Sequence, residues 1–271
     1  MPRADSPAPS PPLRRDLDRA VATLTLQSPA SRNALSLATI EALIEALAAI
    51  AGDGSTRAVV LAADGPAFSA GHDLRELQAH RNDADRGKAF FERAMTRCAA
   101  LMQAIVALEK PVIAAVEGVA TAAGCQLVAA CDLAVAGAAA RFALPGVAIG
   151  LFCSTPLVAV GRAVSRKHAM EMALTGDLYD AAAAERFGLV NRVVAVGAAL
   201  AEARGLAAAI AGRSAATLAI GKRAFYRQVE LPLEEAYALA AQAMVDNLMH
   251  ADAAEGAAAF LDKRAPRWEA S

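Results

Sequence analysis

The hydrophobic pattern of the first two thirds of the chain alternates between short apolar runs and longer segments of helical spacing. Short apolar runs bounded by turn residues are typical of buried strands, and apolar residues at i, i+3 and i+4 predict an amphipathic helix. The runs that predict strands are residues 20–26, 57–62, 110–116 and 131–136. Residues 37–51 have helical spacing, with Ser36 as a plausible N-cap.

The same alternation continues, and then stops. Helices are predicted at residues 86–108, 155–164, 168–174 and 181–187, with a short strand at 189–194. From about residue 200 only helical periodicity remains, at residues 201–211, 215–228, 233–249 and 253–263. Repeated strand–helix units followed by helices alone predict an α/β core with a helical appendage. We expect a tail at 1–13, a core at 14–199, and a helical region at 200–271 that packs on the core or on another subunit.

Composition narrows the class of protein. The 271 residues are long enough for one large domain, and the hydrophobic fraction of 56% includes only 4% aromatic residues. The net charge of −1 and the pI of about 6.4 give no field that favours nucleic acid or an acidic membrane. Polar residues interrupt every long apolar run, and residues 1–12 lack the apolar segment of a secretory signal. We therefore expect a cytoplasmic protein.

Cysteine and histidine spacing argues against a metal site. The four cysteines have no C-x-x-C spacing and lie among apolar residues, which is typical of reduced, buried thiols. The four histidines are scattered and form no metal-binding motif. No metal is expected.

Two glycine-containing turns, residues 68–74 and 120–126, each follow an apolar run and precede a helical segment. Backbone N–H groups at such a helix start have no partner within the helix, and two of them aimed at one point can hold a developing oxyanion. The plainer interpretation is that both are ordinary strand-to-helix turns. Other glycine motifs fail, because Ala216 stands where a P-loop needs its first glycine and Ala67 where a nucleophile elbow needs one.

Seven segments in order carry a more specific signal: residues 31–36, 68–74, 110–118, 123–127, 131–134, 171–176 and 188–191. Together they resemble the enoyl-CoA hydratase/isomerase (crotonase) superfamily over residues 18–268. Residues 142–156 and 241–247, with Gln126, resemble one subgroup of it, which includes a mitochondrial protein of animals and bacterial relatives.

The resemblance implies a crotonase-like spiral of β/α units, a C-terminal helical trimerisation region and an acyl-CoA thioester as substrate. It assigns the thioester oxygen to the backbone N–H groups of His72 and Ala123. Residues expected along the coenzyme A path are Ala70, Asp73 and Leu74, with Phe260 and Lys263 reaching it across a subunit interface. The plainer alternative for Asp73 is that it organises its own turn. For Lys263 it is that the residue is a solvated helix end.

The resemblance also implies no tightly bound cofactor, since coenzyme A is part of the substrate. It implies a homotrimer or a dimer of trimers, in mitochondria if the protein is eukaryotic.

The two glutamates of the hydratase pattern are missing, because Gln126 and Gly146 stand at their positions. A hydratase needs an acid/base pair, and neither an amide nor a glycine can exchange a proton near neutral pH. Two-glutamate hydration is therefore doubtful. Cys153 is a candidate nucleophile or base in their place, and the alternative is that it is an inert buried thiol. The His72 side chain is a second candidate, and the alternative is that only the His72 backbone takes part. Glu117 is expected to support packing or a salt bridge.

Three hypotheses stay open. The first is a hydratase, isomerase, thioesterase or C–C lyase that relies on the oxyanion hole. The second is an acyl-CoA-binding protein with little or no catalysis, and the third is a helical interaction module that uses the C-terminal region alone. The residues expected to shape the acyl pocket are Leu77, Phe90, Leu144 and Leu151.

Overall fold

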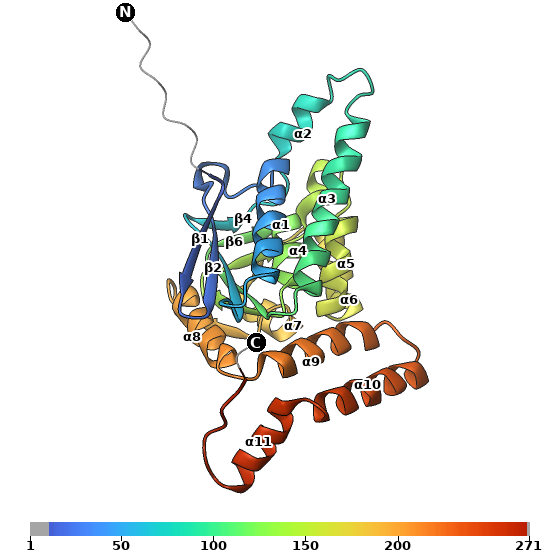
Figure 1. Cartoon of the computed structure of the whole chain (residues 1–271). Helices are drawn as coiled ribbons and strands as arrows, with labels where there is room; N and C mark the ends of the chain where they lie inside the picture. Colours follow the sequence, from blue (N-terminus) through green and yellow to red (C-terminus); the bar gives the residue numbers. More distant parts are fainter. Residues whose placement is uncertain (1–10, 270–271) are drawn as a thin grey trace, which may run out of the picture.

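Two β-sheets organise residues 11–269, the part of the chain that the computed structural model describes (Figure 1). The larger sheet has the strand order β1-β2-β3-β5-β7-β10, and the smaller one has the order β4-β6-β8-β9. The strands of the larger sheet are β1 (Leu13–Asp18), β2 (Val21–Leu26), β3 (Ala58–Ala63), β5 (Val112–Val116), β7 (Leu133–Gly137) and β10 (Arg192–Val194). Those of the smaller sheet are β4 (Ala67–Ser69), β6 (Val119–Thr121), β8 (Arg141–Ala143) and β9 (Tyr179–Asp180).

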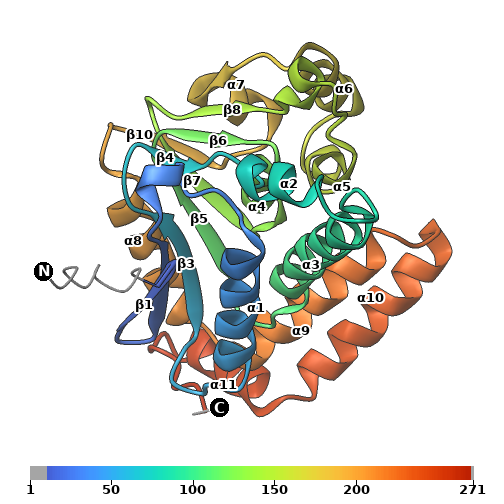
Figure 2. The same ribbon diagram turned by 90° about the horizontal axis from the view of Figure 1, so that it is seen from above.

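Helices cover the larger sheet on both faces. The helices are α1 (Leu37–Ala51), α2 (Leu74–His80), α3 (Lys88–Ala107), α4 (Ala123–Ala130), α5 (Ser154–Ala163), α6 (Arg166–Thr175), α7 (Ala181–Phe187), α8 (Ala199–Ala211), α9 (Ala215–Gln228), α10 (Leu233–Leu248) and α11 (Ala251–Leu261), with 3₁₀ turns η1 (Pro29–Ser31) and η2 (Pro145–Ile149). Helices α1 and α3 lie on one face and α8 on the other (Figure 2). Burial on both faces explains why β3 and β5 are continuous apolar runs, and why Thr23 and Thr25, which alternate with the leucines of β2, are buried as well.

The predicted α/β class is confirmed, and several predicted elements match closely. Helix α1 begins where the sequence places its N-cap, since the Ser36 hydroxyl accepts a hydrogen bond from the Thr39 amide at 3.2 Å. Its apolar stripe is buried, including Ile40 and Leu43. Helices α7 and α9 have the predicted bounds.

Strand β1 and the smaller sheet are not predicted by the hydrophobic pattern. Part of the tail expected at 1–13 lies outside the described residues, and Leu13 already begins β1. Strand β1 is mostly exposed and charged, and it forms by antiparallel pairing with β2. The second glycine turn follows β6, a short strand of the smaller sheet, rather than the 110–116 run directly.

Helix α9 is joined to the core by a half-buried polar cluster around Asp132. The Asp132 carboxylate accepts hydrogen bonds from the Lys222 ammonium at 2.7 Å, the Tyr226 hydroxyl at 3.0 Å and the Val112 amide at 2.7 Å. Burial lowers the pKa of Lys222 and raises that of Tyr226. This cluster fixes α9 beside the strands, whereas α10 and α11 extend away from the core (Figure 1).

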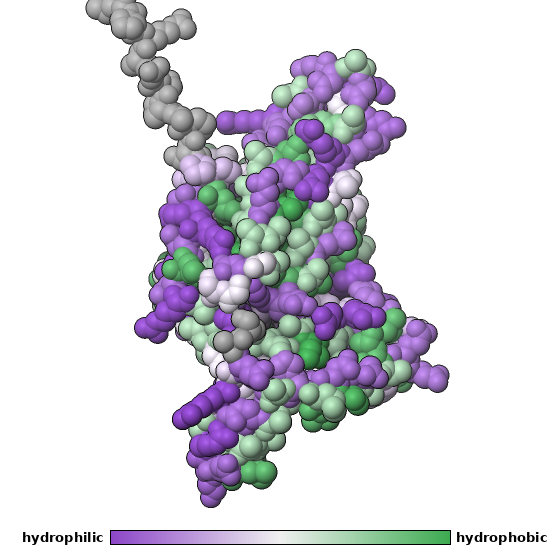
Figure 3. Space-filling model, viewed as in Figure 1, coloured by the Kyte–Doolittle hydropathy of each residue, from purple (hydrophilic) through white to green (hydrophobic). Residues whose placement is uncertain are grey.

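The C-terminal helices carry much of the exposed apolar surface. Figure 3 shows apolar residues among the polar ones on the lower helices of this view, the region of α9 to α11. Exposed apolar side chains here are Phe225, Val229, Leu233, Tyr237, Met244, Val245, Leu248, Met249, Phe260 and Leu261. Within residues 11–269 no helix has the length and apolar character needed to cross a bilayer.

Candidate functional site

The first glycine turn rests on the loop before α1. The Asn33 side chain donates to the backbone oxygens of Asp64 and Ala67, both at 2.8 Å, and the Ser69 hydroxyl donates to the Asn33 oxygen at 2.8 Å. Asn33 is buried and has a left-handed backbone, with φ 52°. Asparagine tolerates that conformation better than most residues. The segment 31–36, one of those that carry the family resemblance, therefore supports the first turn.

His72 lies in a parallel bridge with Leu35 that leaves its own amide free. The Leu35 amide donates to Gly71 oxygen at 2.7 Å, and the Asp73 amide donates to Leu35 oxygen at 3.4 Å. In a parallel bridge of this kind, Leu35 bonds to Gly71 and Asp73, the two neighbours of His72, and not to His72 itself. The His72 N–H therefore points away from Leu35.

The two turns pack backbone against backbone. A Cβ on Gly71 would lie 2.9 Å from the Ala122 Cβ and 3.1 Å from the Ala123 nitrogen, and a Cβ on Gly124 would overlap the Ser69 oxygen. Gly71 also has φ +88°, a conformation that favours glycine. The glycines are therefore required for the close approach of the turns.

Ala123 opens α4 with a free amide. As the first residue of the helix it has no intrahelical acceptor for its N–H. The preceding residue, Ala122, has φ 50° and ψ −120°, a conformation that L residues rarely adopt. The hydrogen bonds found within residues 11–269 include none donated by the amide of either Ala123 or His72. The structure thus brings two unpaired donors, 51 residues apart in sequence, onto adjoining turns.

Asp73 organises its own turn. It is the N-cap of α2, and its carboxylate accepts hydrogen bonds from the amides of Arg75 at 2.9 Å and Glu76 at 3.3 Å. Glu76 in turn accepts from the Leu37 amide at 3.0 Å, which ties α2 to the start of α1. The sequence does not predict this contact of Glu76, because the hydrophobic periodicity of α1 and α2 does not show that the two helices lie side by side.

Ala70 and Leu74, the other two residues expected along the coenzyme A path on this turn, differ in exposure. The Ala70 amide donates to Arg32 oxygen at 3.0 Å, and its oxygen accepts from the Thr121 hydroxyl at 3.2 Å. Leu74 is half exposed and borders an open hollow of about 600 Å³ along α2 with Arg75 and Gln78.

Gln126 is buried on the first turn of α4, one turn after Ala123. Its Oε1 lies 3.9 Å from the Cys98 Sγ, a weak thiol hydrogen bond from α3. Burial raises the pKa of the Cys98 thiol to about 11, so the S–H is present as a donor at neutral pH.

Cys153 takes the space of a side chain at position 146. A Cβ on Gly146 would lie 2.9 Å from the Cys153 Sγ and 2.6 Å from the Leu151 oxygen. Cys153 is buried, and burial raises the pKa of its thiol, against a smaller opposing effect of a backbone hydrogen bond at Gly146. The group at this position is therefore a neutral thiol at neutral pH, which favours a space-filling role over a nucleophilic one.

The His72 ring is mostly enclosed and neutral. Burial lowers the pKa of the imidazole, and its Nε2 is buried without a hydrogen-bond partner among the described residues. Glu117 has a structural role, since its carboxylate accepts a hydrogen bond from the Ala199 amide at 3.0 Å at the start of α8. That is the packing role expected from the sequence.

The residues expected to shape the acyl pocket differ in burial. Leu144 is fully buried, Leu77 is half-buried and Leu151 is half exposed. Phe90 is buried, and its ring stacks on the His80 ring with 3.7 Å between the ring centroids. Phe260 and Lys263 lie at the end of the chain, and Figure 1 places α11 at the opposite end of the molecule from α2. One chain therefore does not bring them to the two turns.

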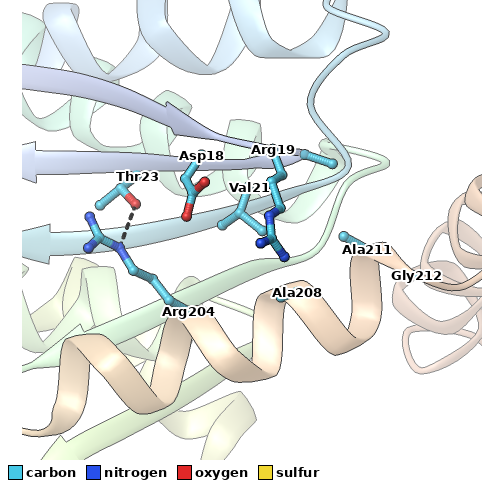
Figure 4. A pocket seen from close by; sticks show the side chains of 9 residues that line it. Asp18, Arg19, Val21, Thr23, Arg204, Ala208, Ala211 and Gly212 are labelled. Atoms are coloured by element: carbon cyan, nitrogen blue, oxygen red, sulfur yellow. Dashed lines mark hydrogen bonds between the residues drawn. The ribbon is translucent and has the colours of Figure 1, made fainter.

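Another cavity, of about 280 Å³, lies between the β1–β2 turn and α8 (Figure 4). Arg204 crosses it and donates from Nε to the Thr23 hydroxyl at 3.2 Å, and Arg19 and Asp18 line its other side. No residue of either glycine turn lines this cavity. Residues 11–269 contain no group of three or more His, Cys, Asp or Glu side chains placed to hold a metal ion.

A family model described as enoyl-CoA hydratase/isomerase matches residues 16–271. The chain belongs to this family. Its resemblance to one subgroup is also confirmed. The rat protein named "Enoyl-CoA hydratase domain-containing protein 3, mitochondrial" is 44% identical over 248 residues, which is 92% of this chain and 81% of that protein. A Thermus thermophilus protein named "Putative enoyl-CoA hydratase" is 37% identical, over 92% of this chain and 97% of its own.

Solved structures confirm the crotonase fold of this family member. The crystal structure of a Mycobacterium smegmatis enoyl-CoA hydratase is 51% identical with a TM-score of 0.90, covering 96% of this chain and 99% of that one. The crystal structure of human enoyl-CoA hydratase domain-containing protein 3 is 42% identical, also with a TM-score of 0.90, covering 95% and 100%. The chain is thus an enoyl-CoA hydratase-like protein of the crotonase fold.

Proposed function

We propose that this protein binds acyl-CoA thioesters and holds the thioester oxygen between the backbone N–H groups of His72 and Ala123. The observation that carries the proposal is the pair of unpaired amides on adjoining turns, one in a bridge that turns it outward and one at a helix start. Each N–H is a fixed donor, and the α4 dipole adds partial positive charge. Family membership supports a CoA thioester as the ligand.

The coenzyme A moiety is proposed to follow Ala70, Asp73 and Leu74 toward the hollow along α2. The exposed Leu74 side chain offers an apolar contact for pantetheine, and Arg75 at the same hollow offers a cation for phosphate. Asp73 contributes by capping α2, so its effect on the ligand is indirect. No tightly bound cofactor is needed, since coenzyme A belongs to the substrate.

For the reaction, we propose a lyase or isomerase family member in which the two-glutamate hydration route does not operate. Gln126 and the Gly146–Cys153 pair supply no carboxylate, and each missing acid or base accounts for roughly 10²–10⁴ in rate. Crotonyl-CoA turnover tests this point. A rate within about tenfold of a two-glutamate hydratase would contradict it, whereas binding without such turnover fits an acyl-CoA-binding protein or another reaction on the same thioester.

For assembly and location, we propose a homotrimer or a dimer of trimers built on α9 to α11. Their exposed apolar side chains support it, and so does the 82% exposure of Phe260, which lacks a covering element in one chain. In a trimer, Phe260 and Lys263 would reach a neighbour's coenzyme A. The proposed location is the cytoplasm, or mitochondria for a eukaryotic protein, as the names of the animal relatives suggest.

Ala123→Pro removes the proposed donor, and its ring carbon takes the place of the N–H hydrogen next to Gly71. Proline is well tolerated at the first position of a helix and has no N–H. We expect butyryl-CoA binding, measured by calorimetry, to weaken by about tenfold or more, because the ring removes one hydrogen bond and also crowds the thioester oxygen. Ala215→Pro at the start of α9 is the matched control, and it should bind like the unaltered chain.

Two results would overturn the proposal. One is an unaltered chain with no measurable affinity for any acyl-CoA, and the other is a folded Ala123→Pro variant that binds as tightly as the unaltered chain. Circular dichroism and the thermal unfolding midpoint of both proline variants check that the overall helix content and the stability are unchanged.

A further inference from the structure

A cavity of about 300 Å³ lies where the start of α9 meets the end of α1 and the loop before β5. The residues that line it come from the segments 51–57, 109–111 and 215–219. None of them belongs to either glycine turn, and Figure 1 shows α9 at the lower side of the core and α2 at its upper end. The cavity is therefore separate from the proposed thioester site.

Arg57 brings to this cavity a positive charge that has no counter-ion among the described residues. Its side chain is half-buried and lines the cavity. A guanidinium has five N–H donors, yet this one makes a single hydrogen bond within residues 11–269, from Nη2 to the Arg213 oxygen at 2.8 Å, and its Nε is buried without a partner. Because a partly desolvated charge without a counter-ion is costly, Arg57 indicates that the cavity takes an anion.

The carboxylates beside the cavity already have partners of their own. Asp53 accepts hydrogen bonds from the Arg15 guanidinium at 2.5 Å and from the Thr56 hydroxyl at 2.8 Å. Glu109 is exposed and accepts from the Arg223 guanidinium of α9 at 2.8 Å. Each of these two carboxylates thus has its own cation, and neither offsets the charge of Arg57 by direct contact.

Lys110 adds a second positive charge to the lining. Its ammonium donates to the backbone oxygens of Ile50 and Asp53, where α1 ends. Burial lowers the pKa of this ammonium against the opposite effect of Asp53, and the nearby charges of Arg15 and Arg57 lower the pKa further. Lys110 therefore contributes charge at the cavity, whereas its hydrogens are used at the end of α1.

The start of α9 supplies free donors to the same cavity. Ala215 and Ala216 are the first two residues of this helix, and both line the cavity. Amides at these positions have no intrahelical acceptor, and the hydrogen bonds within residues 11–269 include none that these two donate. The carboxylate behind the N-cap, Asp252, is bonded by the Ser214 hydroxyl at 2.6 Å and by the Glu269 amide at 2.8 Å, and it does not line the cavity.

We propose that this cavity binds a phosphate group, either free phosphate or that of a small phosphorylated molecule. The Ala215 and Ala216 amides and the Arg57 guanidinium hold the phosphate oxygens, and Lys110 adds charge. A helix start and a guanidinium are donors that suit phosphate, because its oxygens accept several hydrogen bonds and carry the negative charge. The volume of about 300 Å³ leaves room for the rest of a small molecule. The bound anion joins α9 to the core and so stabilises the folded chain.

Titration calorimetry of the full chain with inorganic phosphate, in a chloride buffer of matched ionic strength, tests the inference. We expect one saturable site per chain, with a dissociation constant on the order of 1 mM or tighter, as a few charge-assisted hydrogen bonds imply. Glycerol 3-phosphate is the second probe. If it binds more tightly than inorganic phosphate, the ligand is a phosphorylated molecule, and if it binds equally or more weakly, the ligand is free phosphate.

Arg57→Met and Ala215→Pro each remove one donor from the cavity. Arg57→Met should weaken phosphate binding by about tenfold or more, because a charge is lost with the donor, and Ala215→Pro by about three- to tenfold. The matched controls are Lys167→Met, which removes an exposed cation of α6, and Ala251→Pro at the exposed first position of α11. Both controls should bind phosphate like the unaltered chain.

The inference is overturned if the unaltered chain shows no saturable phosphate binding, or if Arg57→Met binds phosphate as tightly as Lys167→Met. Thermal unfolding in phosphate-free buffer checks that the variants are folded. Should Arg57→Met fail to fold, Ala215→Pro compared with Ala251→Pro decides. Competition between phosphate and butyryl-CoA would also overturn the inference, because it would place the phosphate on the coenzyme A path. A chain that binds phosphate but no acyl-CoA overturns the proposed function and leaves this inference standing.

Discussion

Gly146 is a residue whose missing side chain shapes the site. The space that a Cβ would need is filled by a backbone oxygen, of Leu151, and by the Cys153 thiol. A glutamate does not fit here unless the loop shifts, because the first carbon of its side chain already meets both groups. A side chain at position 146 is therefore excluded by the packing of the loop before α5.

Gly146→Ala is predicted to lower the free energy of unfolding by about 1–3 kcal/mol, the usual cost of overpacking a filled site. Urea denaturation measures the change. Gly205→Ala is the control, since a Cβ there meets nothing within 4 Å outside its own helix, and alanine favours the helix by up to about 1 kcal/mol. A Gly146→Ala variant as stable as the unaltered chain would contradict the tight packing described above.

At the scale of elements, α9 is held by a charge pair rather than by a buried apolar face. Helix α9 has no fully buried residue, yet Lys222 is buried at its side chain and donates to Asp132 and to the Ile105 and Lys110 oxygens. The pair fixes the point from which α10 and α11 leave the core.

Lys222→Met is predicted to destabilise the chain by about 2–3 kcal/mol, because it leaves the half-buried Asp132 carboxylate without its cation. Arg223→Met is the matched control on the same helix. It breaks an exposed pair with Glu109 and should cost about 0–1 kcal/mol. Denaturant midpoints of the two variants compare the effects, and equal midpoints would show that α9 does not depend on Lys222.

The elements differ in how far sequence could predict them, and the reason is physical. Helix α1 and helix α9 follow from apolar spacing, and α1 also from the Ser36 cap. The strands of the smaller sheet are two or three residues long, too short for any period to register. The role of Lys222 could not be read, because its partner Asp132 lies 90 residues away.

The candidate site, too, could be predicted from the sequence only in part. The glycine turns were visible as motifs, but their contact joins Gly71 to Ala122 and Ala123, which only the fold brings together. The Cys98 contact to Gln126 and the Cys153 thiol in the Gly146 space depend on packing between helices, for which local sequence carries no signal.

At the scale of the whole molecule, the exposed apolar side chains of α10 and α11 predict self-association. Leu248→Glu should dissociate the proposed trimer, because a charge would be buried without a partner at the interface. Light scattering of the purified chain measures the mass. Val196→Glu, at 68% exposure against 67% for Leu248, is a control on the loop before α8 and should leave the mass unchanged. A monomeric unaltered chain would contradict the proposed assembly.

Helix α8 decides where this chain can be divided. Ala199, Ala203 and Ala207 pack on the face of the larger sheet that carries Val60 and Ile113. A fragment that stopped at residue 198 would expose this apolar face of the sheet to water and would be prone to aggregate. Any shortened version intended to keep the two glycine turns in a folded, non-aggregating chain should extend past Ala211, so that α8 still covers this face of the sheet.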